Sequence, residues 1–156
     1  MGYYFVMSLR FNKYSASDFG FIPSGENKAI NPYDNSVWIK TTLYDFGWGK
    51  ENGFYKEPIP SFDLLFELAL YSTNSDDMYG AAAIILEKYP EELLAKCEKF
   101  LNDSVQKSEF RKLVELFNLE LPTNRCSLVG KTFEQIQSDY IRWKFISEMA
   151  IKSKST

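Results

Sequence analysis

The stretch Asp76–Tyr89, with the sequence DDMYGAAAIILEKY, has the clearest periodic pattern in the chain. Its apolar residues recur at intervals of three and four, which places them on one face of an α-helix. Pro90 ends this helix and, as a favoured first-turn residue, starts a second one. Because the break is short, we expect the two helices to be antiparallel neighbours. The apolar residues are Met78, Ala81, Ala82, Ile85, Leu86 and Tyr89 on the first helix, and Leu93, Leu94, Cys97 and Leu101 on the second.

Residues 61–156 as a whole are predicted to form about five helices. Ser61 fits the N-cap of the first, because its hydroxyl can accept a hydrogen bond from an otherwise unpaired backbone N–H. Thr132 and Gln135 fit a capping box at the start of the last. The predicted segments are Leu64–Tyr71, Asp76–Tyr89, Pro90–Leu101, Ser108–Asn118 and Thr132–Lys152.

Residues 1–60 show the patterns of strands and loops. Between positions 3 and 11 every odd residue is apolar, which is the period-two pattern of a strand. Val37–Tyr44 is a second candidate strand and Phe54–Lys56 a short third one, while Pro23-Ser24-Gly25 indicates a loop. We therefore expect a predominantly α-helical α+β fold. In it, a small antiparallel N-terminal sheet of two to three strands packs on a C-terminal array of about five helices.

The length of 156 residues suits one domain, 1–156, in which the strand-rich part meets the helical part near Pro58–Ser61. The chain has no histidine, so Ser-His and Cys-His nucleophile pairs and most zinc sites are excluded. Cys97 and Cys126 are too far apart for a CxxC motif, and we expect reduced thiols. We predict a protein that is not an enzyme and that binds no cofactor and no metal.

Membranes and nucleic acids are not expected as partners. No segment approaches the ~18 consecutive apolar residues of a membrane-spanning helix, and we predict a cytoplasmic protein. Residues 1–60 interleave aromatic residues with lysines, but they contain six basic and six acidic residues. A protein that binds single-stranded nucleic acid needs a positively charged groove, which this balance does not favour.

Acidic residues are concentrated between Ser61 and Asp103, where nine Asp or Glu stand against three Lys. Five of the nine fall at predicted helix starts, where the helix dipole favours a carboxylate whatever the protein does. An acidic surface on helices suggests a basic macromolecular partner. The predicted partner-binding residues are Glu67, Glu87, Glu98 and Asp103, supported by Asp76 and Asp77 at a helix start and by Trp48 between two glycines.

The acidic helical stretch Asp76–Leu86, continuing through Tyr89–Leu94, resembles the small cytosolic immunity proteins of bacterial polymorphic-toxin and contact-dependent inhibition systems. The resemblance covers roughly a quarter of the chain. It implies a non-enzymatic protein that blocks a cognate toxin, often a basic nuclease, by covering its active site or an adjacent surface.

Two other functions are compatible with the sequence. The aromatic N-terminal loops suit a small-ligand or carbohydrate-binding domain, with a pocket lined by Trp38, Trp48 and nearby carboxylates, and with Tyr44 and Tyr55 as further stacking rings. Alternatively, the chain is a structural subunit of a larger assembly, which predicts an exposed apolar patch and an oligomer in solution.

Overall fold

The computed structural model describes residues 2–7, 15–45 and 49–154. Within these ranges it contains five β-strands, five α-helices and two 3-10 helices. The chain forms two compact units, Met1–Ile84 and Ile85–Thr156. The boundary falls inside helix α2 (Ser75–Lys88), so the first predicted helix belongs to the same unit as the strands.

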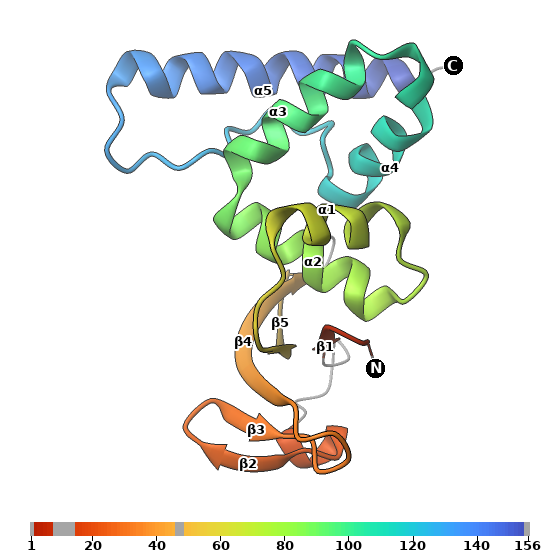
Figure 1. The fold of residues 1–156 in the computed structure, drawn as a ribbon. Helices are drawn as coiled ribbons and strands as arrows, with labels where there is room; N and C mark the ends of the chain where they lie inside the picture. Colours follow the sequence, from red (N-terminus) through yellow and green to blue (C-terminus); the bar gives the residue numbers. More distant parts are fainter. Residues whose placement is uncertain (1, 8–14, 46–48, 155–156) are drawn as a thin grey trace. The chain divides into compact units, whose positions relative to one another are not determined.

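The strands of the N-terminal unit form one antiparallel sheet in the order β1-β5-β4-β3-β2 (Figure 1). The α+β class is confirmed, but the prediction of two to three strands is wrong, because the sheet has five. Their bounds are β1 Phe5–Met7, β2 Ile22–Gly25, β3 Lys28–Ile30, β4 Val37–Asp45 and β5 Gly49–Lys56.

Two short strands, β2 and β3, account for most of the difference. All four residues of β2 are exposed, and the strand contains Pro23, so it has neither the alternation nor the composition of a typical strand. The hairpin turn between them places Asn27 at a φ of 63°, in the left-handed region that asparagine tolerates better than most residues. In addition, β5 begins at Gly49 and not at Phe54.

Aromatic rings form the core on one side of the sheet. Phe21 stacks on Trp38 with ring centroids 4.9 Å apart, and Phe54 meets Phe21 edge to face at 5.8 Å. The indole N–H of Trp38 donates to the hydroxyl of Ser36 at 2.9 Å, so its polar atom is satisfied. The buried cluster consists of Val6, Phe21, Ala29, Trp38 and Phe54, with Ala16 and Phe19 at its border.

Helix α1 (Phe62–Tyr71) follows the sheet in the N-terminal unit. Ser61 is its N-cap, as predicted, and its hydroxyl accepts the N–H of Leu64 at 3.4 Å. The helix is apolar on most of its surface, yet only Leu65, Phe66, Ala69 and Leu70 are buried. One face of α1 is therefore open to solvent.

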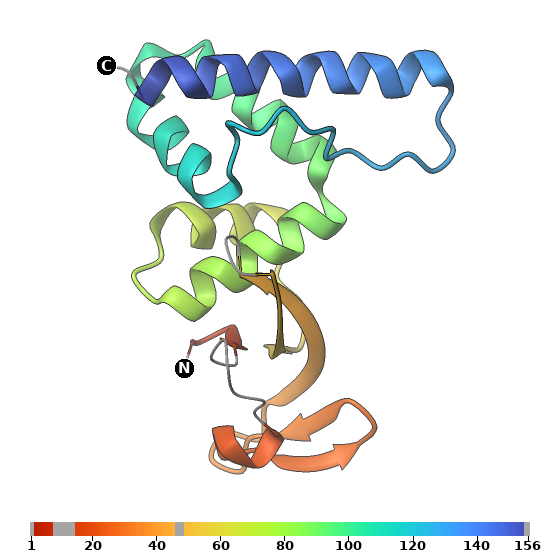
Figure 2. The same cartoon turned by 180° about the vertical axis from the view of Figure 1, so that it is seen from behind.

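The C-terminal unit contains α3 (Pro90–Leu101), α4 (Lys107–Phe117) and α5 (Phe133–Lys154), and α3 lies against both of the others (Figure 2). The predicted helix bounds agree with these within about two residues. The capping box is confirmed: Thr132 N–H donates to Gln135 Oε1 at 2.9 Å, and Gln135 N–H donates to Thr132 Oγ1 at 3.2 Å.

Arg125 organises the loop that joins α4 to α5. Its guanidinium donates to three backbone carbonyls of that loop and lies 4.9 Å from the ring centroid of Trp143. The indole N–H of Trp143 in turn donates to the sulfur of Cys126 at 3.2 Å. Both cysteines are free and buried, and burial raises the pKa of Cys97 to about 12.

Candidate partner-binding surface

Asp77, predicted to support a partner surface, is only 4% exposed. Its carboxylate accepts the backbone N–H groups of Tyr3, Tyr4 and Phe5 at 2.9, 2.8 and 3.0 Å. These bonds occupy the carboxylate and tether the start of β1 to the first turn of α2. Asp77 therefore holds the N-terminal strand in place and is not available to a partner.

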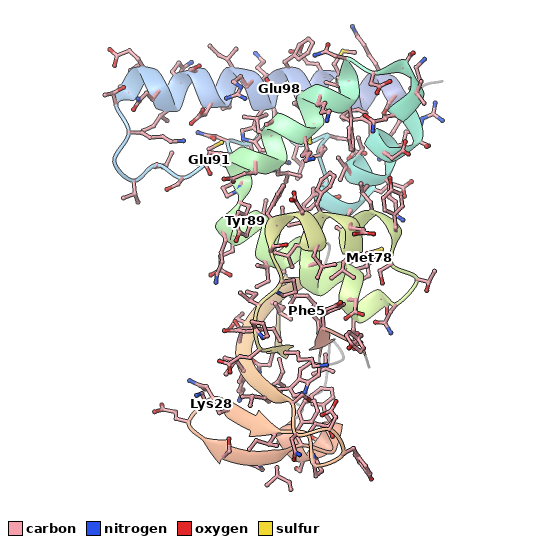
Figure 3. The ribbon with its side chains drawn as sticks, viewed as in Figure 1. Phe5, Lys28, Met78, Tyr89, Glu91 and Glu98 are labelled. Atoms are coloured by element: carbon pink, nitrogen blue, oxygen red, sulfur yellow. The ribbon has the colours of Figure 1, made fainter. Side chains whose placement is uncertain are left out.

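The close approach of β1 to α2 depends on Gly80 and Gly2. A Cβ on Gly80 would come within 2.4 Å of the ring of Phe5, which lies next to α2 (Figure 3). A Cβ on Gly2 would come within 2.3 Å of the Asp77 carboxylate. Asp76 is half-buried beside this contact and accepts the N–H of Met7 at 3.4 Å, and burial raises its pKa.

Glu98 and Asp103, two of the four main predicted site residues, also have structural partners. Glu98 on α3 receives two hydrogen bonds from the guanidinium of Arg142 on α5, one of them 3.0 Å long. Asp103 caps the 3-10 helix Ser104–Gln106 by accepting the N–H of Val105 at 2.9 Å. Both side chains therefore contribute to the packing and capping of the C-terminal unit.

Glu91, at the start of α3, is linked to the loop before α5 (Figure 3). It accepts the N–H of Ser127 and the ammonium of Lys131, both at 3.2 Å. Lys131 also donates to Asp139 at 2.5 Å. Burial works against ionisation of Glu91, but hydrogen bonds from its own N–H, Lys131 and Ser127 lower its pKa.

Among the predicted site residues that the structure describes, Glu67 and Glu87 are exposed. Glu67 lies on α1 in the N-terminal unit, whereas Glu87 lies in the last turn of α2 and belongs to the C-terminal unit. Trp48 lies outside the described residues. The structure thus leaves Glu67 as the member of the predicted set that shares an exposed face with aromatic side chains.

That face is formed by α1 and the residues that precede β1, and we call it the α1 surface. Asp63, Glu67 and Tyr71 follow one another at intervals of four residues, so they form an exposed ridge along the helix. Tyr71 is 60% exposed and Tyr3 is 66% exposed. The α1 surface consists of Tyr3, Tyr4, Asp63, Leu64, Glu67, Leu68 and Tyr71.

The α1 surface contains two adjoining hollows of about 370 and 360 Å³, and Tyr4 and Leu64 line both of them. The rings of Tyr3 and Tyr4 meet edge to face, with centroids 4.8 Å apart. The ammonium of Lys56 lies 4.2 Å from the ring centroid of Tyr3. Lys56 therefore already occupies one face of the Tyr3 ring in a cation–π contact.

Of the rings in the carbohydrate alternative, Trp38 is packed in the sheet core at 3% exposure, and Trp48 and the side chain of Tyr44 lie outside what the structure describes. Tyr55 lines a different hollow, of about 630 Å³, with Asn35–Val37 and Glu57–Ile59. No other aromatic residue is among those lining residues.

A pocket of about 290 Å³ in the C-terminal unit has more cationic than acidic side chains at its rim, in contrast to the acidic α1 surface. Phe100 and Phe110 form its buried floor, and three cationic side chains stand against one carboxylate at its rim. Its lining suits an anion with an apolar group and not a basic protein. The rim residues are Asp103, Lys107, Arg111 and Lys152.

Two carboxylates of the N-terminal unit, Asp18 and Asp34, have local partners. Asp18 accepts the N–H of Ser15 at 2.7 Å, and Asp34 accepts that of Ser36 at 2.9 Å. Within the described ranges, no group of three Cys, Asp or Glu is arranged to hold a metal ion. In the same part of the chain, no helix combines the length and the apolar character needed to cross a bilayer.

Comparison with known proteins adds no further assignment: no family model, no curated protein and no solved structure matches this chain.

Proposed function

We propose that this chain is a non-catalytic protein-binding module that binds a basic protein through the α1 surface, in the manner of an immunity protein that blocks a toxin. The observation that carries the proposal is the exposed ridge of Asp63, Glu67 and Tyr71, beside the half-buried Leu64 and Leu68. Interfaces obtain most of their affinity from aromatic anchors at their centre, and tyrosine is among the most frequent of these.

The charges of the surface favour a basic partner. Asp63 and Glu67 are exposed acids on α1, and Glu57 lines the adjoining hollow. Lys56 is the cation at this hollow, and it is placed over Tyr3. Carboxylates at the rim of an interface speed association with a positively charged partner and discriminate against acidic ones. A basic toxin domain is the partner class that the resemblance to immunity proteins implies.

The proposal is tested by co-expression with the product of the adjacent gene, followed by titration calorimetry of the purified pair at several salt concentrations. Tyr71→Ala is expected to weaken binding about tenfold or more, because truncation of an aromatic anchor costs more than about 1.4 kcal/mol. Glu67→Lys is expected to weaken binding at low salt and to reduce the dependence of the affinity on salt.

Glu26→Lys is the matched control, because Glu26 is exposed in the turn between β2 and β3 and the change in net charge is the same. This variant is expected to bind as the unmodified chain does. Binding that is insensitive to salt, to Glu67→Lys and to Tyr71→Ala would show that the α1 surface is not the interface.

A further inference from the structure

The pocket of the C-terminal unit has an apolar floor below a cationic rim. It lies where the end of α3, the start of α4 and the end of α5 meet (Figure 1). Phe100 and Phe110 are 6 and 4% exposed and form the floor, and the half-buried Leu101 and Met149 complete its apolar part. None of these four side chains has a hydrogen-bond donor or a strong acceptor, so the floor suits an apolar group.

The rim of the pocket is positively charged. Lys107 and Arg111 on α4 and Lys152 on α5 line it and are exposed. Asp103 is the one acid among the described lining residues, and its carboxylate already accepts the N–H of Val105. Arg111 and Lys152 already interact with other groups of the chain, but a guanidinium has five N–H donors and an ammonium three, so a ligand can be added to these partners. The rim therefore favours an anion.

The order of polarity in the pocket restricts the class of ligand. A molecule that enters places an apolar body on the floor and keeps an anionic group at the mouth, beside the cations. Inorganic phosphate and a phospholipid headgroup have no such body, and the polar edge of a nucleotide base would lack partners on the floor. Two phenylalanine rings and a methionine thioether favour an aromatic body, because ring–ring and sulfur–ring contacts add to the free energy of burial. The volume is near the lower end of ligand pockets, so the ligand is small.

We propose that this pocket binds a small aromatic carboxylate, with its ring on Phe100 and Phe110 and its carboxylate next to Lys107 and Arg111. Because the cations are exposed to solvent, a dissociation constant on the order of 0.1–1 mM is expected for a ligand of about ten heavy atoms. The pocket shares no residue with the α1 surface and lies in the other unit, so the inference does not depend on the proposed function.

The test is a titration of the isotope-labelled full chain with cinnamate, followed by NMR chemical shifts. The amide signals that move are expected to belong to the end of α3, the start of α4 and the end of α5. Cinnamamide has the same ring without the charge and is expected to bind about fivefold more weakly. Octanoate carries the same charge on a flexible chain of similar size and is also expected to bind more weakly, because it loses more conformational freedom and makes no ring–ring contact.

A charge reversal at the rim tests the role of the cations. Lys107→Glu is expected to weaken the binding of cinnamate about fivefold or more and to leave that of cinnamamide unchanged, because it alters the rim and not the floor. The fold is expected to tolerate this change, since a carboxylate is favoured in the first turn of a helix, and circular dichroism checks it. Lys88→Glu is the matched control, because Lys88 is exposed in the last turn of α2 and does not line the pocket.

Lys88→Glu is expected to bind cinnamate as the unmodified chain does. Four outcomes would overturn the proposal. They are an absence of shift changes at cinnamate concentrations well above the expected dissociation constant, shift changes confined to other parts of the chain, binding of cinnamamide or octanoate as tight as that of cinnamate, and a Lys107→Glu variant that binds cinnamate normally or loses both ligands equally.

Discussion

At the scale of single residues, Asp77 joins two segments that are more than 70 positions apart in the sequence. A buried carboxylate is costly unless donors surround it, and here three backbone N–H groups do so. The same bonds satisfy N–H groups at the start of β1 that are not paired within the sheet. These hydrogen bonds therefore offset the cost of burying the Asp77 carboxylate and the cost of burying the N–H groups at the start of β1.

Asp77→Asn is expected to destabilise the chain by about 2–4 kcal/mol, because an amide offers one acceptor oxygen and brings N–H groups toward three N–H donors. Urea unfolding followed by circular dichroism measures the change. Asp63→Asn, at an exposed first-turn acid of α1, is the control and is expected to cost well under about 1 kcal/mol. Equal losses in the two variants would contradict the structural role of Asp77.

Gly80 is a helix position at which replacement by alanine is expected to lower the stability of the fold. Glycine to alanine inside a helix normally stabilises by about 0.5–1 kcal/mol. At position 80, however, the new Cβ would meet Phe5 at 2.4 Å, and overpacking of this kind costs about 1–3 kcal/mol. Gly80→Ala is therefore expected to destabilise. In a double-mutant cycle with Phe5→Ala, the penalty of the alanine should disappear, and an additive result would count against the contact.

At the scale of elements, the helices of this chain could be predicted from local signals. The apolar spacing of Asp76–Tyr89, the proline at position 90 and the caps at Ser61 and Thr132 each act within a few residues, and the structure agrees with them. The β2–β3 hairpin lacks such a signal. Its strands contain Pro23 and Gly25 and expose most of their side chains, so their sequences do not show the pattern of strands. The hairpin is part of the sheet because β3 pairs with β4.

The candidate site was less predictable, because the partners of its acids are distant in the sequence. Glu98 meets Arg142, which lies 44 positions away, and no local pattern indicates that pair. The signal that was available is the spacing of Asp63, Glu67 and Tyr71, which places two acids and a ring on one helix face. The tyrosines that complete this surface, Tyr3 and Tyr4, become neighbours of α1 only through the fold.

The capping box at the start of α5 yields a prediction for that element. Thr132→Ala removes the acceptor for the N–H of Gln135 and is expected to cost about 1 kcal/mol in urea unfolding. Gln135→Ala removes the reciprocal bond, and the two losses should be less than additive because each bond orients the other. Thr73→Ala, at an exposed residue outside the helices, serves as the control and should change little.

At the scale of the whole molecule, carboxylates in both units stabilise the folded chain, which makes its stability depend on pH. The Ser36 hydroxyl and N–H hold the pKa of Asp34 below its ordinary value of 3.8, and hydrogen bonds lower that of Glu91 from 4.5. A group with a lowered folded pKa stabilises above its unfolded pKa and loses that contribution as the pH falls through the folded one. Asp76 has the opposite effect on the pH dependence of stability, because burial raises its pKa above 3.8.

Two variants should distinguish the contributions of Glu91 and Asp76 to the pH dependence of stability. Glu91→Gln is expected to lower the free energy of unfolding at pH 7, and the difference from the unmodified chain should shrink as the pH falls through 4.5, the unfolded pKa, and on through the lower folded pKa. Asp76→Asn is expected to leave stability at pH 7 equal or slightly raised, because ionising the half-buried Asp76 opposes folding. This difference should vanish well below pH 3.8, where Asp76 is protonated in both the folded and the unfolded state. Urea titrations from pH 7 to pH 3 measure both differences. A loss of stability in Asp76→Asn at pH 7 as large as that in Glu91→Gln would mean that the hydrogen bond from Met7 to Asp76 outweighs the cost of burying this carboxylate.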